Sequence, residues 1–192
     1  PPTFGMYRVY AQVQGAAVIE VPLEQDQGFA LDSEKLLAAC EENTKLVFLC
    51  SPNNPTGQLL DEAAVFRVCR GLLGRAGVVV DEAYVEFADR ASLIDALESQ
   101  PNLVILRTLS KAYGLAALRV GYAISSAQIA DVLNRVRQPF NVNSLALAAA
   151  CAAFDDAEYL AQSRRVNAAG MAQLEAGFRA LGLGWIPSRG NF

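Results

Sequence analysis

The sequence predicts an α/β fold in which helices sandwich a mostly parallel sheet. Three observations support this prediction: strand-like segments alternate with helical ones, the strand-like segments are continuously apolar, and 53% of the 192 residues are hydrophobic. Strands that are apolar on both faces are typical of parallel sheets covered on both sides by crossover helices. A chain of this length and composition can bury a sizeable core.

Each element is expected from its own local pattern. Runs rich in Val, Ile and Leu predict strands, and apolar residues three or four positions apart predict helices. Asp32 or Ser33 would cap the first helix and Asp61 the second, because short polar side chains accept hydrogen bonds from helix N-terminal amides. In chain order, these patterns predict a strand at 16–23, a helix at 32–42, a strand at 45–51, a turn at 52–57, a helix at 61–73, a strand at 77–84, a helix at 92–99, strands at 102–108 and 119–125, and a helix at 127–138.

From about Asn143 onward the pattern becomes helical. Residues 158–182 predict one long helix or two joined helices, leading to a short strand near Trp185. We therefore expect residues 1–155 to form the main α/β domain, and residues 156–192 to form a connecting helix and the beginning of a smaller α+β C-terminal domain. Because neither end of the sequence resembles a natural terminus, we also expect an interior piece of a longer polypeptide.

Composition excludes several classes of function. A net charge of -4 argues against nucleic acid or an anionic membrane surface as a partner, since both favour a basic face. The longest apolar run, 145–154, is too short to cross a bilayer. The four cysteines lack CxxC spacing and lie in apolar settings, which indicates buried thiols in a reducing cytosol and neither a metal site nor a disulfide. Without histidine, Ser-His-Asp chemistry is excluded within this span, so catalysis would depend on other side chains or a cofactor.

Polar residues gather where three of the expected strands end. In a parallel sheet the loops after successive strands open on one edge, where ligands bind. Taken singly, these residues have plain structural interpretations as a turn, a cap, a core phenol and a solvated charge. Together they place an amide, a carboxylate, a phenol and an amine at one rim: Asn53 and Asn54, Asp81 and Tyr84, and Ser110 and Lys111.

Pyridoxal phosphate is a cofactor that needs this combination. It requires an amine for its Schiff base, which Lys111 would supply, and an acid beside its ring nitrogen, which Asp81 would supply from the end of the apolar GVVV run. A carboxylate there favours the protonated ring, which withdraws electrons from the α-carbon of the substrate. A donor such as Asn54 or Tyr84 would hold the phenolate oxygen of the ring.

The phosphate group of that cofactor requires hydroxyls and a guanidinium. Thr108, Ser110 and Arg119 would supply them, and an arginine can bind a phosphate through two hydrogen bonds. Phe4 has two interpretations that the sequence leaves open, because its ring could stack on the cofactor or simply pack against the protein.

Three segments carrying these residues resemble the signature segments of class II aminotransferases of pyridoxal phosphate fold type I: SPNNPTG (51–57), VVVDEAYVEF (78–87) and RTLSKAYGLAALRVGY (107–122). Within that family the chain is most similar to the histidinol-phosphate aminotransferases, which also share PPTFGMY (1–7) and QPFNVNSLA (138–146). The resemblance therefore implies the large domain of that fold over most of the chain.

The resemblance also implies a role for each residue. Lys111 would be the cofactor-linked lysine, Asp81 the partner of the ring nitrogen, and Tyr84 with Asn54 the contacts of the ring hydroxyl; Lys111, Asp81 and Tyr84 would be the catalytic set. Ser110 and Arg119 would contact the phosphate with help from Thr108, and Phe4 would be the stacking aromatic. The resemblance also implies that the family's substrate-carboxylate arginine would follow the last residue of this sequence.

The implied activity is transfer of an amino group from histidinol phosphate to 2-oxoglutarate in histidine biosynthesis, by a cytoplasmic homodimer with shared active sites. Its partners would be a small-molecule amino donor and a 2-oxo acid. Three alternatives stay open: a threonine-phosphate decarboxylase or an aromatic amino-acid aminotransferase of the same fold, and a regulatory domain that senses the cofactor. The acidic composition gives the regulatory alternative no support.

Overall fold

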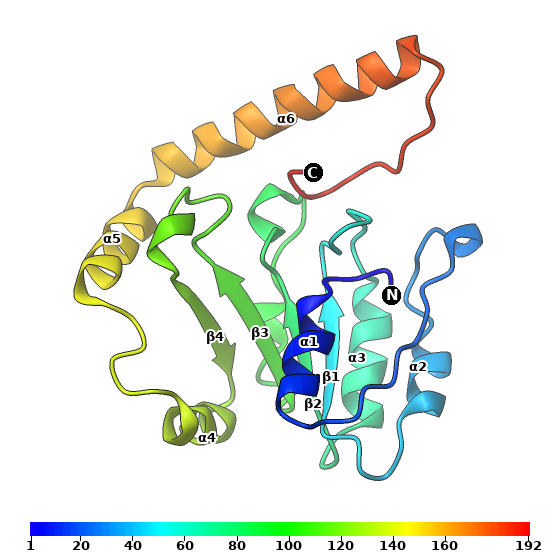
Figure 1. Cartoon of the computed structure of the whole chain (residues 1–192), viewed down its shortest axis with the longest axis vertical. Coiled ribbons are helices and arrows are strands. Elements are labelled where there is room, and N and C mark those ends of the chain that lie inside the picture. Colours follow the sequence, from blue (N-terminus) through cyan, green and yellow to red (C-terminus); the bar gives the residue numbers. More distant parts are fainter.

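A four-stranded sheet forms the centre of the computed structural model, which describes residues 1–192. Strands β1 (Leu46–Cys50), β2 (Gly77–Asp81) and β3 (Leu103–Thr108) run parallel, and β4 (Gly121–Ser125) pairs with β3 in the antiparallel direction. The strand order β1-β2-β3-β4 follows the chain. The predicted α/β fold with a mostly parallel sheet is therefore confirmed (Figure 1).

The main core lies between one face of the sheet and helices α2 (Ser33–Ala39) and α3 (Glu62–Gly71). Alternate residues of a strand point to the same face. The strand residues that share this core accordingly lie two positions apart, and they pack on one another and on both helices: Val47 and Leu49 of β1, Val78 and Val80 of β2, Leu103 and Ile105 of β3, Leu36 of α2, and Val65, Val68 and Cys69 of α3.

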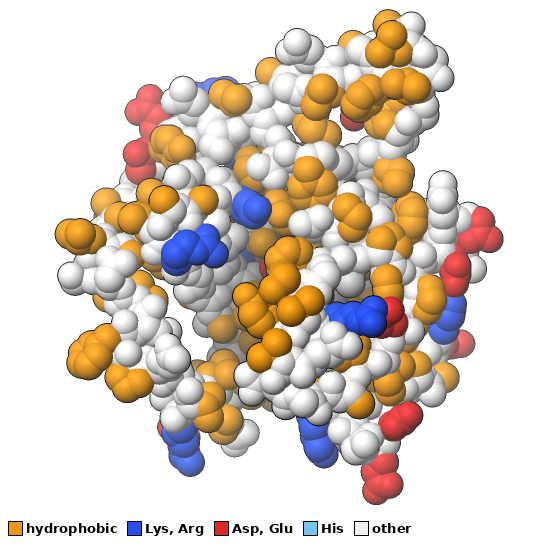
Figure 2. Space-filling model, viewed as in Figure 1, with side chains coloured by type: hydrophobic (Ala, Val, Ile, Leu, Met, Phe, Trp, Pro, Cys, Tyr) orange, Lys and Arg blue, Asp and Glu red, His pale blue; other side chains and the backbone are white.

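Helix α1 (Met6–Val13) covers the opposite face of the sheet and was not predicted from the sequence. The ring of Tyr7 on this helix stacks on Phe48 of β1, with centroids 5.2 Å apart and an interplanar angle of 17°. The outer side of α1 remains exposed at Val9, Tyr10 and Val13, and Figure 2 shows hydrophobic side chains gathered there. The sheet is thus covered on both faces.

Two predicted helix caps are confirmed. The Asp32 carboxylate accepts hydrogen bonds from the backbone amides of Glu34 and Lys35 at the start of α2, and Asp61 accepts one from Ala64 at the start of α3. The predicted helical segment at 92–99 is a 3-10 turn, η3 (Leu93–Ala96). Three other 3-10 turns, η1 (Gln25–Gln27), η2 (Val85–Phe87) and η4 (Ala116–Leu118), lie in connecting segments.

The second half of the chain is helical after the sheet. Helices α4 (Ala127–Val136), α5 (Ser144–Asp155) and α6 (Ala157–Ala180) follow β4 in order, so the long helix expected at 158–182 is a single element. Figure 1 shows α6 crossing above the sheet and the final segment returning toward it. None of the helices has both the length and the apolar character that a membrane crossing requires.

Two expected strands are absent. The segment 16–23 is irregular: its long-range backbone hydrogen bond runs from Leu23 N to Pro1 O at 2.7 Å and does not join the sheet. The region near Trp185 also forms no strand. Both predictions were wrong because an apolar, β-rich run becomes a strand only where a neighbouring strand accepts its hydrogen bonds, and neither segment has such a neighbour.

Candidate active site

The carboxyl ends of β1, β2 and β3 bring the predicted site residues to one edge of the sheet. The parallel register pairs Cys50 with Asp81 and Asp81 with Leu106, so the three strands end at nearly the same level. The turn containing Asn54 follows β1, and Tyr84 and Lys111 follow β2 and β3. Parallel pairing therefore assembles groups that are distant in the sequence, as the sequence predicted.

Tyr84 stands between Asn54 and Lys111. Its side chain is 6% exposed, and its hydroxyl accepts a hydrogen bond from Asn54 Nδ2 at 3.3 Å. The Lys111 Nζ lies over the same ring, 5.0 Å from its centroid. Lys111 itself is exposed and forms no hydrogen bond or ion pair with another side chain. The structure thus presents a free amine beside a fixed phenol and amide.

Asp81 is the last residue of β2, and both of its carboxylate oxygens have a donor. Its Oδ1 accepts a hydrogen bond from the backbone amide of Ala83 at 3.0 Å, and its Oδ2 accepts one from the hydroxyl of Tyr7 at 2.6 Å. Burial, together with the neighbouring Cys50 and Asp81, raises the pKa of Tyr7, so its hydroxyl remains protonated at neutral pH. Sequence reasoning missed Tyr7, although it belongs to the PPTFGMY segment that carries part of the resemblance.

Thr108, Ser110 and Arg119 lie close to one another where β3 ends and β4 begins. The Thr108 hydroxyl accepts a hydrogen bond from the Ser110 backbone amide at 3.1 Å. The bond from Leu109 N to Val120 O, at 3.1 Å, brings the backbone of Arg119 beside that of Ser110. Arg119 adopts a left-handed φ of 55°, and its Nη1 donates to Ala116 O at 2.7 Å. Most guanidinium donors of this exposed arginine therefore remain free for a ligand.

Hydrogen bonds with Asn53 hold the N-terminal segment that carries Phe4 at this edge of the sheet. The Asn53 side chain donates to Pro2 O at 3.0 Å and accepts a hydrogen bond from the Thr3 hydroxyl at 2.8 Å, which holds the N-terminal segment on the turn after β1. Phe4 is 41% exposed and meets the Tyr7 ring edge to face at 5.4 Å. It therefore packs on Tyr7 with much of its own ring uncovered.

The C-terminal segment also closes on the turn after β1. The Arg189 amide donates to Gly57 O at 2.8 Å, and Phe192 meets the Tyr84 ring edge to face at 4.8 Å. Gly57 has a φ of +71°, and a side chain there would collide with Ser188. Glycine fits here because it adopts a positive φ readily and has no side chain to meet Ser188.

A buried ion network supports the loop that carries Tyr84. Arg107 on β3 pairs with Glu86 Oε1 at 2.6 Å and with Glu82 Oε2 at 3.0 Å, and all three side chains are largely buried. Glu82 also accepts hydrogen bonds from the Ser92 hydroxyl at 2.6 Å and from the Leu93 amide at 2.8 Å. No local sequence pattern indicates this network, because the network forms only once β3 and the loop after β2 lie side by side.

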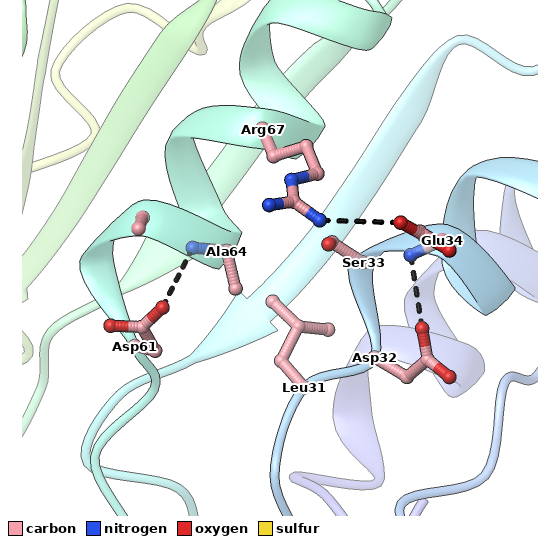
Figure 3. A pocket seen from close by; sticks show the side chains of 8 residues that line it. Leu31, Asp32, Ser33, Glu34, Asp61, Ala64 and Arg67 are labelled. Atoms are coloured by element: carbon pink, nitrogen blue, oxygen red, sulfur yellow. Dashed lines mark hydrogen bonds and ion pairs between the residues drawn. The ribbon is translucent and has the colours of Figure 1, made fainter.

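A separate cavity of about 280 Å³ lies between the starts of α2 and α3 (Figure 3). Its charged groups already have partners, because Asp32 and Asp61 cap their helices and Arg67 pairs with Glu34 at 3.4 Å. It contains none of the predicted site residues. The edge of the sheet is therefore the better candidate for chemistry.

The side chains at that edge suit a flat, anionic ligand. An amine can form a covalent imine with an aldehyde, a carboxylate can accept a hydrogen bond from a protonated ring nitrogen, and a phenol beside an amide can bind a ring oxygen. A guanidinium and two hydroxyls can bind a phosphate. The donor set therefore fits the cofactor that the sequence predicted.

Comparisons with known proteins agree with this geometry. A family model described as aminotransferase class I and II matches residues 1–192. Histidinol-phosphate aminotransferase 2 of Pseudomonas fluorescens is 54% identical to the chain, and the protein of the same name from Pseudomonas aeruginosa is 55% identical. Each alignment covers 98% of this chain and 51% of the relative, so the chain spans about half the length of these relatives.

A solved structure is similar over the same span. The crystal structure of histidinol-phosphate aminotransferase from Sinorhizobium meliloti, in complex with pyridoxal-5'-phosphate, matches with a TM-score of 0.89 and 32% identity. The match covers 98% of this chain and 51% of that one.

Proposed function

Because the chain belongs to the class I and II aminotransferase family, we propose that it forms the cofactor-binding part of a pyridoxal-phosphate-dependent aminotransferase. The observation that carries the proposal is the grouping of Lys111, Tyr84 and Asn54 beside Asp81 at one edge of the sheet. Pyridoxal phosphate, when bound, supplies an electron sink for the α-carbon and a carbon atom that accepts the amino group.

Each residue has a defined task in this proposal. Lys111 Nζ would hold the cofactor covalently, and the same amine would move the proton at the α-carbon of the amino donor. A lysine can perform both tasks because its amine can form an imine and can also transfer a proton. Asp81 would accept a hydrogen bond from the ring nitrogen, and Tyr84 with Asn54 would orient the ring. The Tyr84 hydroxyl lies within hydrogen-bond reach of Asn54, so the two side chains could contact the same atom of a ligand.

Ser110, Arg119 and Thr108 bind the phosphate in this proposal, and Phe4 covers the ring. The uncommitted guanidinium donors of Arg119 and the half-exposed ring of Phe4 support these assignments. Residues 1–155 then form the large domain, and α6 with the segment after it leads into a second, smaller domain. A cytoplasmic homodimer with shared active sites belongs to the same proposal.

The proposed substrates are histidinol phosphate as the amino donor and 2-oxoglutarate as the acceptor. The similarity to two proteins named histidinol-phosphate aminotransferase 2, at 54% and 55% identity, supports this choice. Because the chain spans about half of those relatives, the activity is proposed for the full-length protein.

Amino-donor profiling of the full-length protein tests the proposal. Histidinol phosphate, phenylalanine, tyrosine and threonine phosphate would each be offered with 2-oxoglutarate, and both glutamate and carbon dioxide would be measured. We expect glutamate formation with histidinol phosphate as the preferred donor and no carbon dioxide. Release of carbon dioxide from threonine phosphate would identify a decarboxylase, and preference for phenylalanine or tyrosine would identify an aromatic aminotransferase.

A further inference from the structure

We propose that Tyr7 is a positioning residue that orients the Asp81 carboxylate toward the ring nitrogen of the cofactor. This inference rests on the proposed function, because it concerns how the same site binds pyridoxal phosphate. It begins from the hydrogen bond of 2.6 Å between the Tyr7 hydroxyl and Asp81 Oδ2, which joins residues on different elements of the fold.

The fold brings Tyr7 and Asp81 to the same face of the sheet. Val78 and Val80 of β2 point into the core beneath α2 and α3, so Asp81, one position further, points to the face that α1 covers. Phe48 of β1 points to that face as well, and the Tyr7 ring stacks on it. The phenol therefore reaches Asp81 across the surface of the sheet.

Aromatic packing fixes the direction of the Tyr7 hydroxyl. Phe48 stacks on one face of the ring at 5.2 Å, and Phe4 meets it at an angle of 79° and a centroid distance of 5.4 Å. A tyrosine ring held in this way has little freedom to swing, so its hydroxyl stays in line with the carboxylate. Tyr10, one helical turn further along α1, is 65% exposed and has no such packing.

The Tyr7 hydroxyl is the donor in its bond with Asp81. Burial is the largest cause that raises the pKa of Tyr7, and the neighbouring Cys50 and Asp81 raise it further, so the phenol keeps its proton throughout the physiological range. Burial likewise raises the pKa of Cys50 to about 11, which leaves that thiol neutral. Asp81 therefore faces two neutral side chains on this side and meets no competing negative charge.

The Asp81 carboxylate has one donor on each oxygen and keeps one acceptor position free on each. The Ala83 amide holds Oδ1 and Tyr7 holds Oδ2, so the plane of the carboxylate is fixed from two sides. A carboxylate oxygen accepts two hydrogen bonds, which leaves room for a ring N–H. Without the Tyr7 hydroxyl, the carboxylate would be held by Ala83 alone and could rotate away from the ring.

Cofactor affinity of the full-length apoprotein tests this role independently of turnover. Dissociation constants would be measured for pyridoxal phosphate and for its 1-deaza analogue, in which a C–H group replaces the ring nitrogen. Tyr7→Phe keeps the ring that packs on Phe48 and removes only the hydroxyl. We expect it to weaken binding of pyridoxal phosphate about 10- to 100-fold, as loss of an orienting partner does at metal sites, and to change binding of the analogue less than about threefold.

Two further variants complete the experiment. Tyr10→Phe should change neither constant, and Tyr7→Phe should cause no additional loss in an Asp81→Ala background. An equal loss for both ligands, an undiminished affinity for pyridoxal phosphate, or a full additional loss in Asp81→Ala would each overturn the role of Tyr7 while leaving the proposed function intact. Failure of the unsubstituted protein to bind pyridoxal phosphate would instead overturn the proposed function, and this inference with it.

Discussion

The amino group of Lys111 lies 5.0 Å above the ring of Tyr84, although the two residues follow different strands. The ring offers Lys111 a weak cation–π contact, worth about 0.5–1 kcal/mol at an exposed site, and Lys111 has no acidic partner. An amine held in this way can leave the ring at little cost to react with a ligand. The relationship therefore favours a reactive lysine over a structural one.

Replacement of Lys111 by alanine should abolish transamination by the full-length protein while allowing some pyridoxal phosphate to bind without a covalent bond. We expect a loss of at least about 10³-fold, because the substitution removes both the proposed covalent link and the proposed base. The measurements are steady-state rates and the visible absorbance of the bound cofactor. Lys35 is the matched control, since it lies on the surface and pairs with Glu24 at 2.8 Å.

Borohydride reduction followed by peptide mapping identifies the linked lysine directly. Within this chain the label should appear on the peptide carrying Lys111 and not on those carrying Lys35 or Lys45. Labelling of either of these lysines, or normal turnover by Lys111→Ala, would contradict the assignment.

Asp81→Ala should reduce the rate far more than Tyr84→Phe. The first substitution removes the carboxylate proposed to contact the ring nitrogen, for which we expect a loss of about 10²–10⁴-fold by analogy with general acid–base groups. The second removes one hydroxyl that contacts Asn54 at 3.3 Å and keeps the ring beneath Lys111, so a loss of about 10-fold is expected. The measurement is kcat/KM of each variant relative to the unsubstituted protein. Similar losses for the two variants would show that the roles of Asp81 and Tyr84 are wrongly assigned.

The central sheet could be predicted because its strands carry their own signal. Val78 to Val80 and Leu103 to Ile105 are apolar on both faces, which occurs where helices cover both sides of a sheet. Helix α1 was missed because it starts after Gly5 without a side-chain cap and has no buried residue. The segment 16–23 was assigned a strand that it does not form, since strand formation depends on a neighbour that local sequence does not specify.

The candidate site could be predicted only in part. Parallel strands bring their C-terminal loops together, so the proximity of Asn54, Tyr84 and Lys111 follows from the order of elements. The bond between Tyr7 and Asp81 does not, because it depends on how α1 lies across the sheet. The pairing of Arg107 with Glu82 and Glu86 was also missed, as an arginine in a strand gives no local indication of its partner.

Arg107→Ala should destabilise the protein strongly. The substitution leaves Glu82 and Glu86 buried without a cation, and loss of one member of a buried ion pair costs about 3–5 kcal/mol. Chemical denaturation of the full-length protein measures the free energy of unfolding. Arg135→Ala is the control, because Arg135 forms an exposed pair with Asp131 on α4 and should cost at most about 0.5 kcal/mol.

A second substitution separates charge from packing at Arg107. Adding Glu86→Gln to Arg107→Ala removes one of the unpaired charges and should restore part of the lost stability, so the two effects should not add. If the double variant is less stable than Arg107→Ala by the full cost of the single Glu86→Gln change, the network does not act through its charges.

The buried carboxyl of Glu86 should make stability depend on pH. Burial is the main cause that raises the pKa of Glu86, and Arg107 opposes it only in part; the neighbouring Glu82 raises it further. One oxygen, Oε2, is buried without a hydrogen-bond partner. Arg164 on α6 donates to the backbone carbonyl of Glu86 and leaves this oxygen unpaired.

The direction of this pH dependence follows from proton binding to Glu86 in the folded and unfolded chains. Above the unfolded glutamate pKa of about 4.3, the folded chain keeps a proton on Glu86 that the unfolded chain has lost. The contribution of Glu86 to stability is therefore full below that pH. It falls as pH rises through the raised pKa of Glu86 in the folded chain. Glu86→Gln removes this titration.

The free energy of unfolding of the Glu86→Gln variant, measured relative to the unsubstituted protein between pH 4 and about pH 7.5, should therefore increase with pH. The control is Glu34→Gln, at an exposed site paired with Arg67, which should show no such increase. A difference that stays constant or decreases with pH would mean that Glu86 is ionised at the start of the range and that Arg107 outweighs its burial.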